Sequence, residues 1–263
     1  MPRAEQGEEP GLVARLRAAG CEFAEEEAAL LAAASDDPAV VESLVARRVA
    51  GEPLEPMLGW AEFAGLRVLV RPGVFVPRRR TEHLVDHAEA RLAGHPGPVL
   101  LDLCCGSGAI GLALATRLRV ADLHAADVEP AAVACARLNL GPVGGTVHEG
   151  DLFDALPDRL RGRLDLVVAN VPYVPSPALA TMPPEARDHE PRVALDGGAD
   201  GLDVVRRVAQ AVPGWLAGGG WVLVETTEAQ SATAAAAFTD AGLDAEFEAD
   251  EDGTYVVAAR SRR

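Results

Sequence analysis

The stretch LLDLCCGSGAIGLALA, residues 100–115, decides the fold. It begins as an apolar strand with an acid at Asp102, continues as a turn that contains Gly106 and Gly108, and ends as an apolar segment of helical length. Glycines in such a turn let the backbone approach a ligand, and the start of the next helix offers free N–H groups. The spacing differs from the GxGxxG of dinucleotide-binding proteins, which argues against NAD. The turn alone is weak evidence, because tight packing of a helix on a strand also favours glycine.

Apolar runs alternate with segments of helical length from about residue 81 onwards. This alternation is typical of βαβ units and of a mainly parallel sheet. The expected strands are PVLLDL, VADLHAAD, TVHEGD, LDLVVAN and GGWVLVET, and the expected helices are AIGLALATRL, PAAVACARLNL and GLDVVRRVAQAVPGWLA. The end of the chain, DAEFEADEDGTYVVAARSRR, is expected to add two antiparallel edge strands around Asp252-Gly253. We therefore predict an α/β protein with a mostly parallel seven-stranded sheet that ends in an antiparallel hairpin.

The segment before residue 81 has a different pattern. Residues 11 to 50 contain three short helical segments. The first ends at Gly20, and the third begins near Pro38 and ends at Gly51. The next β-rich runs lie on either side of Arg71-Pro72-Gly73 and suggest a hairpin. We predict three parts: a small helical domain at 1–50, a β-hairpin linker at 51–80 and the main α/β domain at 81–263.

The charge of the chain is strongly acidic. A net charge of -16 and a pI near 4.8 give no general attraction to nucleic acid or to anionic membranes. Arg78-Arg79-Arg80 is the one candidate for a local basic patch, and a solvated loop is the simpler interpretation of it.

No metal site is expected. The four cysteines contain no CxxC pair, and His83 and His87, four residues apart on an expected helix, lack a third ligand nearby. The sequence shows no signal peptide and no apolar run of about 18 residues, so we expect a cytoplasmic protein without a membrane span.

The residues that end the strands are the candidates for a site, because ligands of open α/β sheets lie across the carboxyl ends of the strands. Asp127 is well placed to accept hydrogen bonds from ribose hydroxyls, although an acid there could also stabilise the start of the next helix. Asp151 could accept from an adenine amino group while Leu152 or Phe153 covers the ring, or it could belong to an ordinary turn. The stretch VVANVPYVPS, residues 167–176, ends a buried strand in an amide, a proline and an aromatic ring.

These four strand ends, in this order, resemble those of class I S-adenosylmethionine-dependent methyltransferases. The resemblance becomes more specific over the segments GEPLEPMLGWAEFAGLRVLVRPGVFVPR, LDLCCGSGAIGLALA, GDLFDAL, VANVPYV and PPEARDHEPRVALDGGADGLDVVRRVAQAVPGWLAGGGWVLVE. Together they resemble the protein-(glutamine amide) methyltransferases of the HemK/PrmC type, from about Gly51 to Glu225 and beyond. The block HEPRVALDGGADGL is the most diagnostic part, because generic methyltransferases lack it.

The resemblance implies a Rossmann-like methyltransferase domain at 81–263, S-adenosylmethionine as the cofactor and a protein substrate. It also implies that the helical domain at 1–50 serves substrate recognition. Enzymes of this family methylate the side-chain amide nitrogen of a glutamine, in the best-known members that of a peptide release factor. The family motif implies that the side chain of Asn170 and the carbonyl of Val171 accept hydrogen bonds from the target amide, with Pro172 in the same motif and Tyr173 packed on the target group. The implied cofactor contacts are Asp102, Cys104, Cys105, Gly106, Ser107, Gly108, Asp127, Asp151, Leu152 and Asn170.

The sequence departs from the family pattern at several places. Val171 replaces the first proline of Asn-Pro-Pro-Tyr, which keeps the carbonyl but frees φ. Cys104 replaces the usual first glycine of the cofactor turn, Arg79 and Arg80 stand where the family has Pro or Ser and an acid, and the helical segment is short. We therefore expect a divergent member whose substrate could differ.

Three other functions remain open at this stage. A small-molecule N-methyltransferase that acts on a specialised metabolite fits the short helical segment. A nucleic-acid base methyltransferase fits Asn-x-Pro-Tyr, because aryl amines present similar N–H donors, but the acidic charge disfavours it. A cofactor-binding protein without activity would have no need of Asn170, Pro172 and Tyr173.

Overall fold

The computed structural model describes residues 11–250 and 253–262, and it contains two compact units, Met1–Gly59 and Trp60–Arg263. The described part of the first unit holds the helices α1 (Leu12–Ala18), α2 (Ala24–Ala33), α3 (Pro38–Val49) and α4 (Leu54–Leu58). Leu16, Leu31 and Val45 are fully buried in a small core that these helices share. The carboxylate of Asp37 accepts a hydrogen bond from the backbone N–H of Ala39 and so caps α3.

The second unit begins with a hairpin of β1 (Trp60–Phe63) and β2 (Leu66–Leu69). We predicted that the chain turns at Arg71-Pro72-Gly73, and this was wrong, because the strands reverse at Ala64-Gly65. Both turn residues are left-handed, with φ of 51° and 74°, as the two-residue turn that matches the twist of a hairpin requires. The boundary between the two compact units follows Gly59, so the hairpin lies in the second unit. The division of the chain at residues 50 and 80 stays a prediction.

The central sheet has seven strands in the order β5-β4-β3-β6-β7-β9-β8. They are β3 (Val99–Leu103), β4 (Asp122–Asp127), β5 (Thr146–Glu149), β6 (Leu164–Ala169), β7 (Leu216–Thr226), β8 (Asp244–Ala249) and β9 (Tyr255–Arg260). The first five in sequence are parallel, and β9 pairs antiparallel with both β7 and β8. The predicted sheet is thus confirmed, although Asp252 of the expected turn lies outside the described residues.

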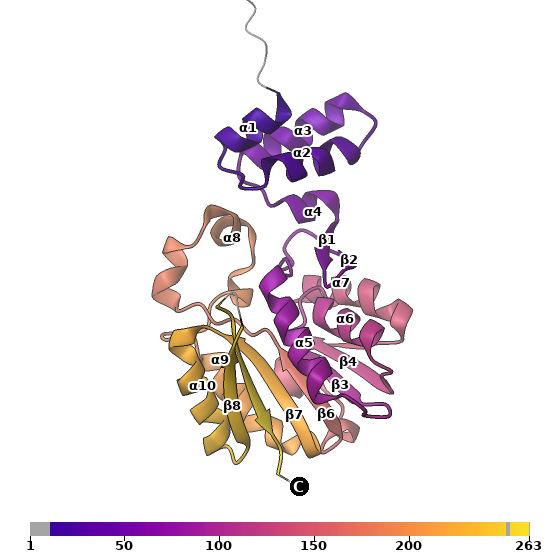
Figure 1. Cartoon of the computed structure of the whole chain (residues 1–263), viewed down its shortest axis with the longest axis vertical. Helices are drawn as coiled ribbons and strands as arrows, with labels where there is room; N and C mark the ends of the chain where they lie inside the picture. The colour runs from indigo at the N-terminus through magenta and orange to yellow at the C-terminus, as the bar shows by residue number, and fades with distance from the viewer. Residues whose placement is uncertain (1–10, 251–252, 263) are drawn as a thin grey trace, which may run out of the picture. The chain divides into compact units, whose positions relative to one another are not determined.

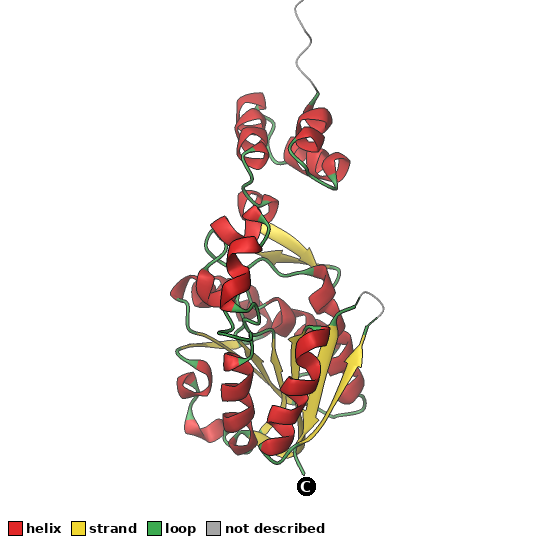
Figure 2. Ribbon diagram, turned by 90° about the vertical axis from the view of Figure 1, so that its left-hand side faces the viewer, coloured by secondary structure: helices red, strands yellow, loops and turns green. Residues whose placement is uncertain are grey.

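Helices cover both faces of this sheet (Figures 1 and 2). One layer contains α5 (Glu82–Arg91), α6 (Ala109–Arg117) and α7 (Pro130–Leu140), the other contains α9 (Asp203–Ala211) and α10 (Glu228–Asp240), and the short α8 (Pro184–His189) lies between β6 and α9 in sequence. Strand β6 shows how the sheet separates two cores. Leu166 and Val168 pack with the first layer, whereas Val167 and Ala169 pack with the second, because successive strand side chains point to opposite faces.

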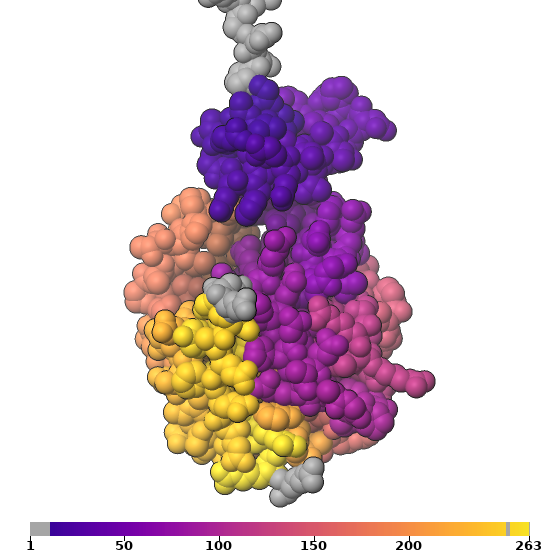
Figure 3. Space-filling model, in the orientation of Figure 1, coloured from indigo at the N-terminus to yellow at the C-terminus, as the bar shows by residue number. Residues whose placement is uncertain are grey.

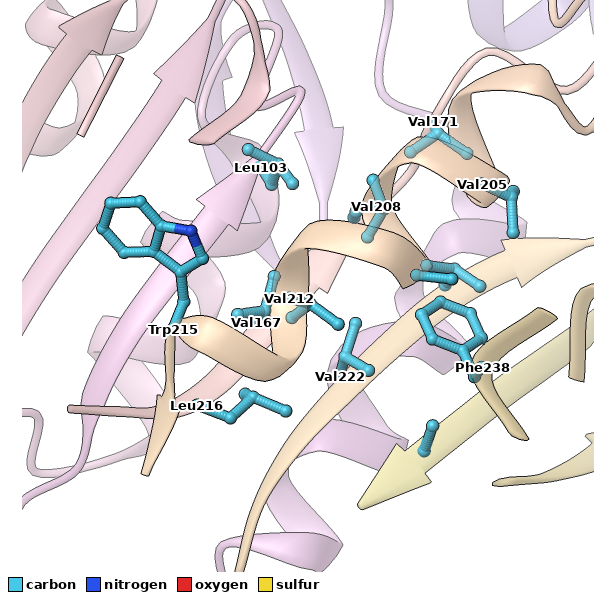
Figure 4. Close-up of a cluster of buried hydrophobic side chains, with 14 of the residues drawn as sticks. Leu103, Val167, Val171, Val205, Val208, Val212, Trp215, Leu216, Val222 and Phe238 are labelled. Atoms are coloured by element: carbon cyan, nitrogen blue, oxygen red, sulfur yellow. The ribbon is translucent and has the colours of Figure 1, made fainter. Parts of the chain in front are cut away.

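The core under α9 reaches the end of β6. Figure 4 shows Val205 and Val208 of α9 and Val222 of β7 pointing into one cluster, with Val171 beside them. Val205 and Val208 are fully buried, and burial of one such side chain contributes about 1.5–3 kcal/mol. The segment that follows β6 is therefore anchored in the core by the side chain of Val171.

The C-terminal strands pack beside α5. In the space-filling view the yellow C-terminal segment lies directly against the purple of α5 (Figure 3). The guanidinium of Arg91 on α5 donates to Glu246 of β8 at 3.0 Å, which ties the edge strand to the helix.

No helix in the described part of the chain has the length and apolar character needed to cross a membrane.

The strand order places a crevice at one end of the sheet. From β3 the chain continues to β4 on one side, and β6 pairs with β3 on the other side. The carboxyl ends of β3 and β6 therefore border the point at which the direction of winding reverses, where open α/β sheets bind ligands. The segments 104–108 and 170–173 both begin at this point.

Candidate active site

A pocket of about 260 Å³ opens at the carboxyl ends of the parallel strands. Most of the residues singled out in the sequence line it: Cys104, Cys105, Gly106, Ser107, Asp127, Asp151, Leu152, Asn170, Val171, Pro172 and Tyr173. Asp102 and Gly108 are not among its lining residues. Four strand ends that are distant in sequence, those of β3, β4, β5 and β6, thus meet in one cavity.

The turn after β3 has a left-handed backbone at three positions. Cys104, Gly106 and Gly108 have φ of 57°, 54° and 78°. A Cβ on Gly106 would meet no atom within 4 Å, so this glycine faces open space, whereas a Cβ on Gly108 would lie 3.0 Å from the side chain of Leu140. Gly106 therefore leaves the backbone accessible at the pocket, while Gly108 permits close packing of α6 and α7.

Asp102 lies beneath this turn. Its side chain is buried, and its Oδ2 accepts a hydrogen bond of 2.8 Å from the backbone N–H of Gly111 in α6. Burial raises the pKa of this carboxyl to about 8, the nearby Asp127 adds to the rise, and the Gly111 N–H opposes it. The geometry gives Asp102 a role in holding the first turn of α6, and direct contact with the cofactor stays a prediction.

Asp127, at the end of β4, is held by the backbone. Its Oδ2 accepts from the N–H of Gly106 at 2.8 Å, and its Oδ1 accepts from the N–H of Glu129 at 2.9 Å. Burial raises its pKa, and these backbone hydrogen bonds lower it. Each carboxylate oxygen can accept a further hydrogen bond, so Asp127 can both fix the glycine turn and bind a hydroxyl group.

Asp151 has a partner that the sequence did not indicate. Its Oδ2 accepts from Arg207 of α9 at 2.6 Å, and both side chains are about half exposed. The next residue, Leu152, lines the pocket with a left-handed φ of 49°. Arg207 follows Asp151 by 56 residues, so no local pattern could have paired the two.

Asn170 and Val171 present two oxygen atoms at the end of β6. The side-chain nitrogen of Asn170 donates to Oγ1 of the buried Thr81 at 3.2 Å, which turns Oδ1 away from this contact. Val171 is 1% exposed as a whole residue and its side chain packs in the core, while the residue also lines the pocket, so its backbone is the part that faces the cavity. Among the described residues neither Oδ1 of Asn170 nor the carbonyl oxygen of Val171 receives a hydrogen bond.

Tyr173 borders the same pocket with its phenol tied on two sides. Its hydroxyl accepts from Arg80 at 2.9 Å and donates to Glu225 at 3.2 Å. Burial, with the neighbouring Glu225, raises the pKa of Tyr173 to about 12, and Arg80 opposes the rise. The phenol is therefore neutral at pH 7.

The diagnostic block braces this loop through backbone contacts. The N–H of Val174 donates to the carbonyl of Leu195 at 2.9 Å, and the N–H of Gly197 donates to the carbonyl of Val174 at 2.8 Å. A Cβ on Gly197 would lie 2.7 Å from the carbonyl oxygen of Pro172. A Cβ on Gly201, whose φ is +80°, would collide with the carbonyl of Tyr173. These glycines are required because two backbones run in contact.

Comparison with known proteins agrees with this geometry. Residues 65–182 match the model of the methyltransferase small domain. A release factor glutamine methyltransferase of Geobacter sulfurreducens is 42% identical over 210 residues, which are 79% of this chain and 72% of the relative. One from Mycolicibacterium smegmatis is 39% identical over 272 residues, 95% of each chain. This protein belongs to the release factor glutamine methyltransferase family. It is an S-adenosylmethionine-dependent N-methyltransferase.

One relative is named for a different activity. The 4-amino-L-phenylalanine/4-methylamino-L-phenylalanine methyltransferase of Streptomyces pristinaespiralis is 38% identical over 203 residues, 75% of this chain and 69% of the relative. Among solved structures, the Thermus thermophilus 16S rRNA N2 G1207 methyltransferase in complex with AdoMet and guanosine has a TM-score of 0.56 at 20% identity, over 77% of this chain and 50% of that one. This likeness confirms the predicted Rossmann-like fold.

The pocket fits the expected cofactor. S-adenosylmethionine carries ribose hydroxyls, an adenine amino group and a positive sulfonium, and the lining offers the carboxylates of Asp127 and Asp151 together with the open backbone at Gly106. Apolar side chains of Ile110, Val128 and Leu152 line the pocket beside these polar groups. Among the described residues no cluster of three His, Cys, Asp or Glu side chains could hold a metal ion.

Proposed function

We propose that this protein methylates the side-chain amide nitrogen of a glutamine in a peptide release factor or another translation protein. The observation that carries the proposal is the pair of oxygen acceptors, Oδ1 of Asn170 and the carbonyl of Val171, which belong to two residues that line the pocket at the end of β6. The relatives named release factor glutamine methyltransferase support the same acceptor. Such a substrate would place the activity in the cytoplasm.

The two acceptors suit the chemistry of a carboxamide. Its nitrogen is a poor nucleophile because its lone pair is delocalised, so the enzyme must hold the NH₂ group in one orientation. Two oxygen atoms can accept both hydrogens of one NH₂ group, and such orientation can supply about 7–11 kcal/mol of the barrier. When bound, S-adenosylmethionine supplies an electrophilic methyl group on a sulfonium. Thr81 keeps the amide of Asn170 from rotating, since it accepts from its nitrogen.

The helical unit would take part in substrate recognition. Four helices form its described part and share a small core, so it is a folded module and not a flexible extension. We propose that it binds the release factor away from the target glutamine. Removal of residues 1–50 would then raise the KM for the release factor and leave the Kd for S-adenosylmethionine unchanged.

The test is transfer of labelled methyl groups to a purified release factor. The native enzyme should yield methylglutamine at one position by mass spectrometry, and a release factor with that glutamine replaced by alanine should stay unlabelled. Asn170→Ala removes one acceptor and should abolish transfer while the affinity for S-adenosylmethionine changes by less than about threefold. Full turnover by the Asn170→Ala variant would refute the proposed mechanism.

A second candidate acceptor is a small aryl amine. The Streptomyces pristinaespiralis relative supports it, and the apolar residues Phe75, Met182 and Val193 line the same pocket as Asn170. An aryl NH₂ group has two N–H donors, as an amide does. Labelling of an extract of the source organism separates the possibilities: label retained with protein favours the glutamine, and label that passes a size filter favours the amine. Label removed by nuclease would point to a nucleic acid.

A further inference from the structure

The three arginines expected to form a solvated basic loop have three different environments. Arg78 donates to the buried Glu190 at 2.5 Å, and Arg80 contacts the Tyr173 hydroxyl. Arg79 is exposed, and its side chain has no hydrogen-bond or ion-pair partner among the described residues. Only part of the run is therefore a solvated surface, and Arg80 belongs to the wall of the pocket.

Arg80, Tyr173 and Glu225 form a closed set of contacts. The guanidinium of Arg80 donates to the Tyr173 hydroxyl at 2.9 Å, and its Nε lies 3.5 Å from Oε1 of Glu225. The hydroxyl of Tyr173 donates to the same Oε1 at 3.2 Å. Each of the three groups thus touches the other two, which restricts the phenol more than a single hydrogen bond would.

The buried carboxylate explains why a cation is needed here. The side chain of Glu225, at the end of β7, is 2% exposed, and its Oε2 has no hydrogen-bond partner among the described residues. A buried charge is costly unless it is paired. The guanidinium of Arg80, with a side chain 52% exposed, supplies the opposite charge from the solvent side.

The backbone of Tyr173 is fixed independently of its phenol. The side-chain nitrogen of Gln230 in α10 donates to the carbonyl of Tyr173 at 2.8 Å, and Gly201 packs against the same carbonyl. With the main chain held, the remaining freedom of Tyr173 is rotation of its side chain. The contacts of the hydroxyl with Arg80 and Glu225 are what restrict that rotation.

We propose that Arg80 is a positioning residue, which holds the ring of Tyr173 in the orientation that shapes the acceptor end of the pocket. The inference rests on the proposed function in one respect: Tyr173 must border the group that accepts the methyl. Arg80 itself acts through Tyr173. Cofactor binding, which uses the residues at the ends of β3, β4 and β5, should not depend on it.

Kinetics of three variants test the proposal. Arg80→Met should lower kcat/KM for the acceptor by roughly tenfold to a hundredfold, the range expected when a group near the reacting atoms is displaced by about 1 Å. The Kd for S-adenosylmethionine should stay within about twofold. Arg80→Lys keeps the charge but not the planar fork, so it should recover part of the activity. Arg79→Met, which changes an adjacent exposed arginine, is the matched control and should behave as the native enzyme.

A double variant separates positioning from folding. Arg80→Met leaves the buried Glu225 without its cation and could unfold the protein for that reason alone. In Arg80→Met/Glu225→Gln the unpaired charge is removed, so stability should return while the acceptor kinetics stay impaired. Recovery of native kcat/KM together with stability would overturn the proposal, since the role of Arg80 would then be only to neutralise Glu225.

A second readout needs no acceptor. The chain contains two tyrosines, Tyr173 and Tyr255, so ring-labelled tyrosine gives two sets of NMR signals, and Tyr255→Phe assigns them. The Tyr173 signals should shift in Arg80→Met/Glu225→Gln and stay in place in Arg79→Met. Unchanged Tyr173 signals in the double variant would overturn the proposal. Failure of the native enzyme to methylate a release factor would refute the proposed function, while these signals would still decide whether Arg80 holds Tyr173.

Discussion

The buried carboxyl of Asp102 should make the stability of the protein depend on pH in a defined direction. In the folded state its pKa is raised from 3.8 to about 8, because the side chain is buried. Below pH 4 the group is protonated in both the folded and the unfolded state, and its stabilising effect is complete. Between about pH 4 and pH 8 only the unfolded state releases the proton, so stability falls as the pH rises. Above pH 8 both states are ionised and the loss stops growing.

The size of the effect follows from linkage. A single group lowers the free energy of unfolding by about 1.4 kcal/mol per pH unit inside that window, so by pH 7 the loss would reach up to about 4 kcal/mol. Asp102→Asn has the shape of the protonated acid and keeps an oxygen to accept from the N–H of Gly111. The variant should lack this part of the pH dependence and should be more stable than the native protein at pH 8.

Urea unfolding of both proteins between pH 5 and pH 9 measures the difference. The difference in the free energy of unfolding should grow with pH up to about pH 8 and then level off. A constant difference across the range would refute the reasoning, because Asp102 would then ionise normally in the folded state. The same samples test the predicted role in cofactor binding. Asp102 is absent from the pocket lining, so a Kd for S-adenosylmethionine that stays within about threefold would exclude the predicted contact, and a larger loss of affinity would support it.

Three further predictions concern the pocket. Asp127→Ala should weaken S-adenosylmethionine binding by about 1.5–3 kcal/mol, the value of a hydrogen bond to a charged group; calorimetry measures it, and an unchanged Kd would exclude Asp127 as a ligand. Gly201→Ala should abolish methyl transfer and lower the melting temperature, because its Cβ would collide with the carbonyl of Tyr173; native activity would show that the two backbones can separate. Cys104→Gly should stabilise the protein by about 0.5–1 kcal/mol. The left-handed φ of 57° costs a non-glycine residue about 1–2 kcal/mol, and part of this gain is lost because glycine raises the conformational entropy of the unfolded chain. A lower urea midpoint would contradict this.

Much of the sheet could be predicted because its strands are continuous apolar runs that end in polar residues. Two errors have local causes. The turn at Ala64-Gly65 was missed because alanine rarely adopts a positive φ, whereas Arg71-Pro72-Gly73 carries the usual turn residues. Helix α10 was not predicted because its alanine-rich sequence has no amphipathic period, although Thr227 and Gln230 form the capping box at its start.

The candidate site divides in the same way. The lining residues that the sequence indicates stand in short contiguous motifs at the strand ends, whereas Arg80 and Arg207 of the same lining lie in no such motif. The residues that hold these motifs in place lie far away in sequence. Thr81 is hydrogen-bonded to Asn170 across 89 residues, and Gln230 is hydrogen-bonded to Tyr173 across 57. Such partners are brought together by the fold of the second unit, and no spacing in a single sequence predicts them.

The position of Val171 bears on how this enzyme can tolerate mutation. Its side chain fills the core under α9, while the oxygen expected to bind the acceptor belongs to its backbone. The reactive contact is thus not encoded by the identity of the residue, and any apolar side chain of suitable volume would leave it in place. Substitutions of Val171 would be limited only by how well the new side chain packs in the core. The hydrogen bond from the acceptor to this carbonyl can be kept while the residue at position 171 changes. A search for active-site residues by side-chain type would therefore miss this position.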